Sequence, residues 1–147
     1  GKGEMKDWRN EMQVLPIGKG KKLCDGDDIA VLSIGPIGNE VIKAIEMVKE
    51  EGVSIAHYDM IYLKPLDEEL LHEIGQKYNR IITVENGVIK GGFGSAVLEF
   101  MADNGYTPHV KRIGVPDAFI EHGSIPELYQ LCGMDAESIA KQLKKEN

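Results

Sequence analysis

The residues best suited to bind a ligand lie in a turn between Arg80 and Asp103. A β-branched apolar run that ends at Val84 predicts a buried strand, and the apolar spacing after Gly94 predicts a packed helix. Backbone amides at the start of such a helix can face an anion or another chain. The glycines can also serve only to bring the helix close to the sheet, and this is the preferred interpretation of a short glycine motif. The candidate residues of the turn are Glu85, Asn86, Gly91, Gly92, Gly94 and Ser95.

Histidines supply the other candidate for chemistry. His122 stands beside Glu121 in a predicted loop and is the best single candidate for proton transfer, although a structural or interfacial role is the preferred interpretation. His57, inside a predicted strand, is expected to be a hydrogen-bonded histidine of the sheet rather than a ligand. The four histidines are scattered and predict no metal site. Ser95 lacks the G-x-S-x-G setting of a catalytic serine, so the residues alone predict no complete catalytic set.

Composition excludes several classes of protein. The 147 residues carry 17 basic and 24 acidic side chains, and the resulting net charge of −7 argues against a nucleic-acid or anionic-membrane partner. No apolar run approaches the roughly 20 residues that span a bilayer, and the charged N-terminus is not a secretory signal. Two widely separated cysteines, Cys24 and Cys132, indicate a reduced, cytoplasmic chain. Because no initiator methionine is present, we expect a fragment of a longer protein.

Predicted strands and helices alternate along the chain. Apolar runs predict strands at 28–34, 53–58, 81–84 and 109–113, of which the last is polar enough for a sheet edge. Helical spacing predicts helices at 39–49, 67–74, 95–101 and 124–131, and a last one from 135 onwards. Before them, 12–17 is expected to be an edge strand or a docking arm, and 18–22 a solvated turn. The alternation predicts a parallel-rich sheet with helices on both faces, whose ligands would lie at the carboxyl ends of the strands.

Three motifs together resemble one family. They are YDMIYLKPLDEELL, ITVENGVIKGGFGSAVLEF and IGVPDAFIEHGS, and GMDAESIAKQL follows near the end of the chain. In this order and spacing they resemble the C-terminal domain of the 1-deoxy-D-xylulose-5-phosphate synthases. Related domains occur in transketolase and in the β subunit of 2-oxo-acid dehydrogenases. The resemblance covers about residues 12–147 and leaves 1–11 as a linker from an upstream domain. It implies a three-layer α/β/α fold whose mostly parallel five-stranded sheet has one antiparallel edge strand.

The resemblance also implies a function for the whole enzyme. The family uses thiamine diphosphate and Mg²⁺ to join pyruvate and glyceraldehyde 3-phosphate with loss of carbon dioxide, on the route to isoprenoids, thiamine and pyridoxal. Its cofactor is bound by two upstream domains, and its third domain packs on the second and supports a homodimer. We therefore expect a scaffold domain that binds no cofactor and is inactive alone; the alternative is a subunit-docking module of a transketolase or a 2-oxo-acid dehydrogenase.

One position departs from the family. The usual V-E-E-N motif is replaced by Val84, Glu85, Asn86 and Gly87, so the second carboxylate is lost. Any role of that carboxylate is therefore in doubt in this chain. The turn residues and His122 are expected to face the missing domains.

Overall fold

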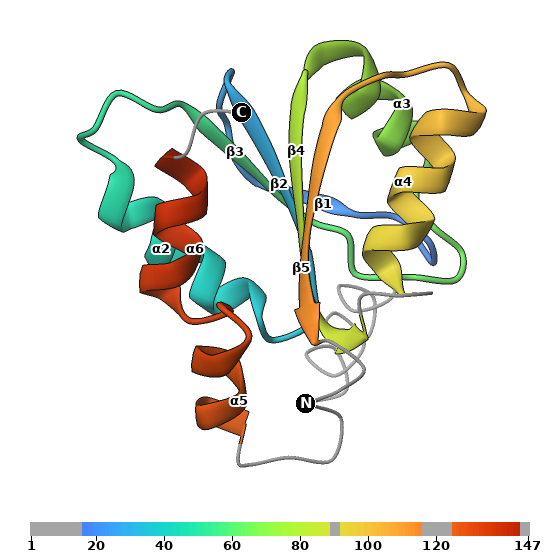
Figure 1. The fold of residues 1–147 in the computed structure, drawn as a ribbon. Helices are drawn as coiled ribbons and strands as arrows, with labels where there is room; N and C mark the ends of the chain where they lie inside the picture. Colours follow the sequence, from blue (N-terminus) through green and yellow to red (C-terminus); the bar gives the residue numbers. More distant parts are fainter. Residues whose placement is uncertain (1–15, 89–91, 116–124, 145–147) are drawn as a thin grey trace, which may run out of the picture.

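A computed structural model describes residues 16–88, 92–115 and 125–144 (Figure 1). The strands are β1 Lys21–Cys24, β2 Ile29–Ile34, β3 Ile55–Asp59, β4 Arg80–Val88 and β5 His109–Val115. The helices are α2 Gly38–Val48, α3 Glu68–Lys77, α4 Phe93–Asp103, α5 Ile125–Leu131 and α6 Ala136–Lys144. Strand and helix alternate through most of the described chain, which confirms the predicted α/β class.

The five strands form a single sheet in the order β1-β3-β2-β4-β5. Neighbouring strands are parallel except at the edge, where β1 runs antiparallel to β3. The sheet arrangement implied by the family resemblance is thereby confirmed. The residues of the edge strand differ from the prediction, because Lys21 and Lys22, expected in a solvated turn, belong to β1 and pair with Asp59 and Tyr58. This pairing joins segments far apart in the sequence, so local glycine and lysine signals could not indicate it.

Alternation along β2 explains why helices cover both faces of the sheet. Ile29 and Val31 contribute to a core with residues of α2 and α6, whereas Ala30 and Leu32 contribute to a core with residues of α3 and α4. All four side chains are fully buried. Figure 1 shows the same division, with α2 and α6 on one side of the sheet and α3 and α4 on the other. Period-two alternation in a strand buried on both faces therefore gives the three-layer fold.

Strand β4 is longer than the sequence predicts. The polar residues after Val84 were expected to end the strand, but β4 continues to Val88, which pairs with Val115 of β5. The register shifts between Val84 and Val88, and such an irregularity absorbs residues that do not fit a regular ladder. The prediction of the strand end is thus wrong because pairing with β5 resumes beyond the polar residues.

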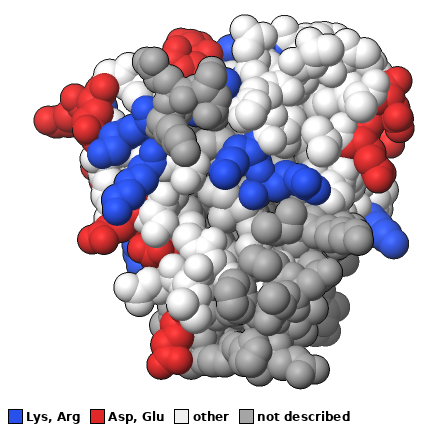
Figure 2. All heavy atoms as spheres, viewed as in Figure 1, with Lys and Arg blue, Asp and Glu red and all other residues white. Residues whose placement is uncertain are grey.

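Strand β5 forms the second outer edge of the sheet among the described residues. Its exposed residues include His109 and Lys111, and Figure 2 shows Lys and Arg side chains gathered near the middle of the face on which β5 lies. Charged side chains on an outer strand discourage pairing with another sheet. The prediction of a polar edge strand is confirmed. In the parts of the chain that the structure describes, no helix combines the length and apolar character that crossing a bilayer requires.

Candidate functional site

Glu85 lies near the carboxyl end of β4, and its carboxylate caps the first turn of α4. Oε1 accepts a hydrogen bond of 2.8 Å from the Phe93 amide, and Oε2 accepts one of 2.6 Å from the Gly94 amide. Glu85 is only 4% exposed. The first amides of a helix lack partners within the helix and carry its positive partial charge, so they bind a carboxylate well. The anion at this helix start is therefore supplied by the protein itself.

Gly94 allows α4 to pack closely on β4. A Cβ atom added to Gly94 would lie 2.6 Å from Thr83 Oγ1 and 3.1 Å from Arg112 Cγ, so a larger residue would displace the helix or its neighbours. Thr83 is fully buried beneath it. Gly92, the N-cap, has a φ of −92°, which other residues adopt freely. The packing interpretation of the glycine motif is thus supported at Gly94.

Two further candidates connect this turn to neighbouring elements. Asn86 Nδ2 donates a hydrogen bond of 2.7 Å to the Tyr129 hydroxyl of α5. Ser95 Oγ accepts one of 3.0 Å from Arg112 Nη1 of β5. Ser95 is therefore held by a cation rather than by a catalytic base in this contact. Both hydrogen bonds fix how the end of β4 and the start of α4 lie against the rest of the domain.

The structure brings part of the predicted site together. The Gly94 amide donates a hydrogen bond to Glu85 at the start of α4. Gly92 and Ser95 belong to the same helix start, Gly92 as its N-cap and Ser95 directly after Gly94. Asn86 makes its hydrogen bond to α5 instead. The remaining candidates, Gly91 and His122, lie outside the described residues, and so does Glu121, the neighbour of His122.

The loop after β3 leaves the same end of the sheet and contains a strained residue. Ile61 has a φ of +63°, a conformation that a β-branched side chain rarely adopts. Hydrogen bonds on both sides of Ile61 hold it there, because its amide donates to Asp59 Oδ1 at 3.0 Å and the Tyr62 amide donates to the Met60 carbonyl at 2.5 Å. Backbone strain of this kind is concentrated at functional sites and interfaces. We therefore include this loop, together with Glu85 and Asn86, in a candidate contact region.

These residues do not form a site for a diphosphate with its metal. The amides of Phe93 and Gly94, which could bind a phosphate at the start of α4, are already occupied by Glu85. Within the described ranges, no three His, Cys, Asp or Glu side chains lie close enough to hold a metal ion. The described arrangement can support neighbouring structure, but it offers no set of groups for covalent or acid–base catalysis.

A buried pair was missed by the sequence analysis. Ser33 Oγ of β2 lies 2.7 Å from His57 Nε2 of β3, and each residue is 1% exposed. Burial lowers the pKa of His57 from 6.5 to about 4, and the nearby Asp59 carboxylate only partly opposes this effect. The histidine is thus neutral at pH 7 and hydrogen-bonded inside the sheet, as predicted. Ser33 gave no signal, because its partner is 24 residues away and is reached only through the parallel register of β2 and β3.

The chain belongs to the transketolase C-terminal domain family, because the family model described as "Transketolase, C-terminal domain" matches residues 18–139. The fold agrees with this assignment. One solved structure is a split-gene transketolase, an inactive tetramer of four β subunits. It superposes with a TM-score of 0.79 and is 31% identical over 88% of this chain and 42% of that chain. Campylobacter jejuni transketolase is 13% identical and shares the fold, with a TM-score of 0.62 over 86% of this chain and 18% of its own.

The curated relatives indicate which enzymes of this family the chain is similar to in sequence. The 1-deoxy-D-xylulose-5-phosphate synthase of Parabacteroides distasonis is 99% identical over 147 residues, which are 100% of this chain and 23% of that protein. The synthase of Bacteroides fragilis is 58% identical over 146 residues, 99% of this chain and 22% of that protein. The chain is therefore similar to the C-terminal part of such synthases, as the motifs indicate, and it spans less than a quarter of their length.

Proposed function

We propose that this chain is the C-terminal scaffold domain of a 1-deoxy-D-xylulose-5-phosphate synthase. In this proposal residues 1–11 are a linker from an upstream domain and 12–147 form the transketolase-type domain. The whole enzyme joins pyruvate to glyceraldehyde 3-phosphate and releases carbon dioxide as a homodimer. Thiamine diphosphate and Mg²⁺ are held by the upstream domains, and the chain alone forms no product.

The capping of α4 by Glu85 is the observation that carries the scaffold role. A helix start that could bind a phosphate is instead closed by a buried carboxylate, so its hydrogen bonds stabilise the domain rather than a ligand. The 99% identity to a synthase supports the choice of enzyme. The 31% identical relative is a split-gene transketolase solved as an inactive tetramer of four β subunits. This relative supports the proposal that one part of such an enzyme is inactive by itself.

The proposed contact surface lies at the carboxyl ends of the parallel strands. Its described part contains the end of β4 with Glu85 and Asn86, the start of α4 with Gly92, Gly94 and Ser95, and the strained loop at Ile61. Gly91 and His122, which lie outside the described residues, belong to it in this proposal. In this surface Glu85 acts as a positioning residue, because its carboxylate holds the first turn of α4. Tyr62 and Leu63, which follow Ile61 and are both partly exposed, provide apolar contact area for an upstream domain.

Complementation tests this proposal. The Parabacteroides distasonis relative would be truncated to remove the residues that match this chain. The truncated enzyme and this chain would then be mixed with thiamine diphosphate, Mg²⁺ and both substrates. We expect release of carbon dioxide from pyruvate only in the mixture, and size-exclusion chromatography to show a complex. The matched controls are each part alone and a mixture that contains heat-unfolded chain.

Two outcomes would reject the scaffold role. One is release of carbon dioxide from pyruvate by the chain alone, and the other is full activity of the truncated enzyme without the chain. A stable chain that does not associate with the truncated enzyme but is retained by another dehydrogenase subunit would favour the docking-module alternative.

A further inference from the structure

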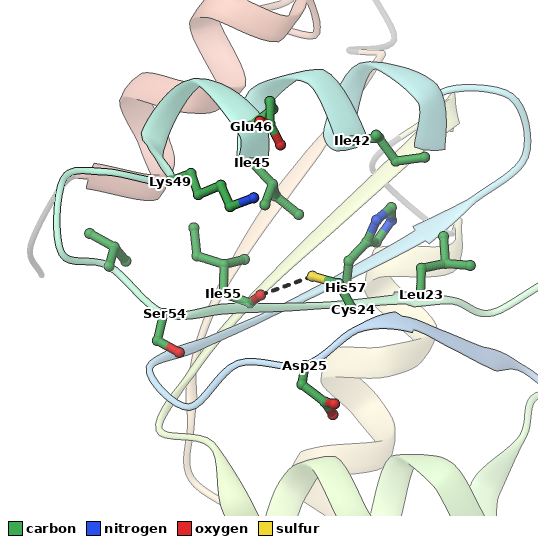
Figure 3. Close-up of a pocket in the computed structure, with 11 residues that line it drawn as sticks. Leu23, Cys24, Asp25, Ile42, Ile45, Glu46, Lys49, Ser54, Ile55 and His57 are labelled. Carbon is green, nitrogen blue, oxygen red and sulfur yellow. Dashed lines mark hydrogen bonds between the residues drawn. The ribbon is translucent and has the colours of Figure 1, made fainter.

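A groove lies between helix α2, the edge strand β1 and its neighbour β3 (Figure 3). Helix α2 is on the opposite side of the sheet from α4 (Figure 1). The volume of the groove is about 590 Å³, within the range of small-molecule sites. Helix α2 packs against β2 and β3, and β1 extends the sheet on the outer side of β3. Apolar side chains form most of the wall of the groove: Leu23, Ile42, Ile45, Val53 and Ile55.

His57 contributes a polar group to this apolar wall. Figure 3 shows its ring directed from β3 into the space beneath α2, near Ile42. Its Nε2 atom is bound to Ser33 Oγ at 2.7 Å, whereas Nδ1 has no hydrogen-bond partner among the described residues. The residue is 1% exposed. The fully buried side-chain atoms without a hydrogen-bond partner in the described chain are Thr83 Oγ1 and Asp135 Oδ1. His57 Nδ1 is not one of them, so this nitrogen is reached from the groove that His57 lines.

The Ser33 hydroxyl determines which proton His57 carries. In the described part of the chain, Ser33 Oγ has no hydrogen-bond partner other than His57 Nε2, so the hydroxyl is satisfied when it donates to that nitrogen. Nε2 then accepts, and the proton of the neutral imidazole resides on Nδ1. The groove therefore presents one N–H donor. The nearby Cys24 thiol does not compete as a donor, because it donates to the Ile55 carbonyl at 3.2 Å.

We propose that this groove binds a compact apolar molecule that carries one hydrogen-bond acceptor oxygen, which accepts from His57 Nδ1. The apolar walls bury the body of the ligand, and the single donor fixes its orientation. The rim carries both charge signs, with Glu46 and Lys49 on the side of α2 and Asp25 on the side of β1. Asp25 is paired with Lys22 at 2.7 Å. The rim therefore has no excess of one sign that would select a multiply charged ligand, and an uncharged ligand is favoured.

A pair of matched probes tests this proposal on the 147-residue chain. Acetophenone has an apolar ring and a carbonyl oxygen, and α-methylstyrene has the same shape with a methylene group in place of the oxygen. In an NMR titration we expect acetophenone to shift the His57 ring nitrogen signals and the amides of Ile42 and Ile55. We expect it to bind about fivefold more tightly than α-methylstyrene, the usual effect of one hydrogen bond.

Variants separate the donor from the shape of the groove. Ser33→Ala combined with His57→Phe removes both polar groups, and the preference for acetophenone should disappear. Ile42→Trp should fill the groove and abolish binding of both probes. Met47→Trp is its matched control, because Met47 lies on the same helix with 51% exposure, against 50% for Ile42, and does not line the groove.

Equal affinities for the two probes in the unmodified chain would overturn the proposal. So would undiminished binding to the Ile42→Trp variant, or no binding of acetophenone at millimolar concentration. The titration is repeated on the full-length Parabacteroides distasonis relative. Loss of binding there would overturn the small-molecule assignment, because it would mean that another part of the longer protein covers the groove.

Discussion

Two polar regions of this domain use their hydrogen-bonding groups in opposite ways. At the end of β4, both oxygens of the buried Glu85 carboxylate accept hydrogen bonds from backbone amides of α4. In the groove beside α2, the buried His57 ring uses one nitrogen in a bond to Ser33, and the other has no partner among the described residues. The first region is closed around its polar group, and the second leaves a ring nitrogen without a partner in the wall of the groove.

The comparison shows that sequence motifs do not distinguish a structural polar group from a functional one. The glycine-rich turn has the appearance of an anion site, yet the protein supplies the anion. His57 has the appearance of an ordinary sheet histidine, yet it lines the groove. What separates Glu85 from His57 is whether all hydrogen-bonding atoms of that one side chain have partners within the fold, and this is known only once distant segments are placed together.

Removing the Glu85 carboxylate should have the largest effect. Glu85→Ala leaves the buried amides of Phe93 and Gly94 without their acceptor and removes the negative charge from the start of α4. We expect the free energy of unfolding to fall by about 4 kcal/mol, since hydrogen bonds to charged groups contribute more than neutral ones and their buried partners are left unpaired. Urea unfolding followed by circular dichroism would measure it.

The control for this prediction is Glu99→Ala. Glu99 is an exposed carboxylate on the same helix, away from its first turn, so its removal should change the free energy of unfolding by less than about 0.5 kcal/mol. Equal effects of the two substitutions would mean that α4 does not depend on its cap, and the closed character of the first region would be wrong.

The sequence predicted the architecture better than the sites. The continuous apolar run at 28–34 and the repeated strand–helix order were sufficient to predict the parallel sheet, because they are local patterns. The edge strand Lys21–Cys24 was not predicted, since its pairing with β3 depends on a segment more than 30 residues away. The same reason hid the contacts of Ser33 with His57 and of Asn86 with Tyr129, each of which joins two separate elements. Glu85 was identified as a candidate, but its role as a helix cap required the position of α4.

The pH dependence of stability should show the second largest effect, in the open region. Above pH 6.5 the imidazole of His57 is neutral in both the folded and unfolded chain. Below it the unfolded chain binds a proton that the folded chain does not bind until its pKa of about 4 is reached, so stability is lost as the pH falls through this window. The loss from this group should reach about 3 kcal/mol.

Acidic residues also titrate in this range, so the measurement is a difference between two proteins. Urea unfolding from pH 7 to pH 4 would be compared for the unmodified chain and the variant with Ser33→Ala and His57→Phe. The variant should lose less stability over this interval. Parallel curves would show that the buried histidine does not resist protonation, and the contrast with the fully satisfied Glu85 would weaken.

Gly94→Ala should have the smallest of these effects and tests whether the closed region depends on shape as well as on charge. The added Cβ would lie 2.6 Å from Thr83 Oγ1, so α4 must move away from β4 and strain the hydrogen bonds that its first amides donate to Glu85. We expect the free energy of unfolding to fall by about 2 kcal/mol, which is typical of overpacking.

Thr83 Oγ1 is buried without a hydrogen-bond partner in the described structure, so Thr83→Ala makes room without breaking a hydrogen bond. In that background the cost of Gly94→Ala should fall by about 1 kcal/mol, measured as a double-mutant cycle in urea. An unchanged cost of Gly94→Ala would mean that its strain does not come from the contact with Thr83. The stability of this region would then depend on the Glu85 cap and not on the close packing at Gly94.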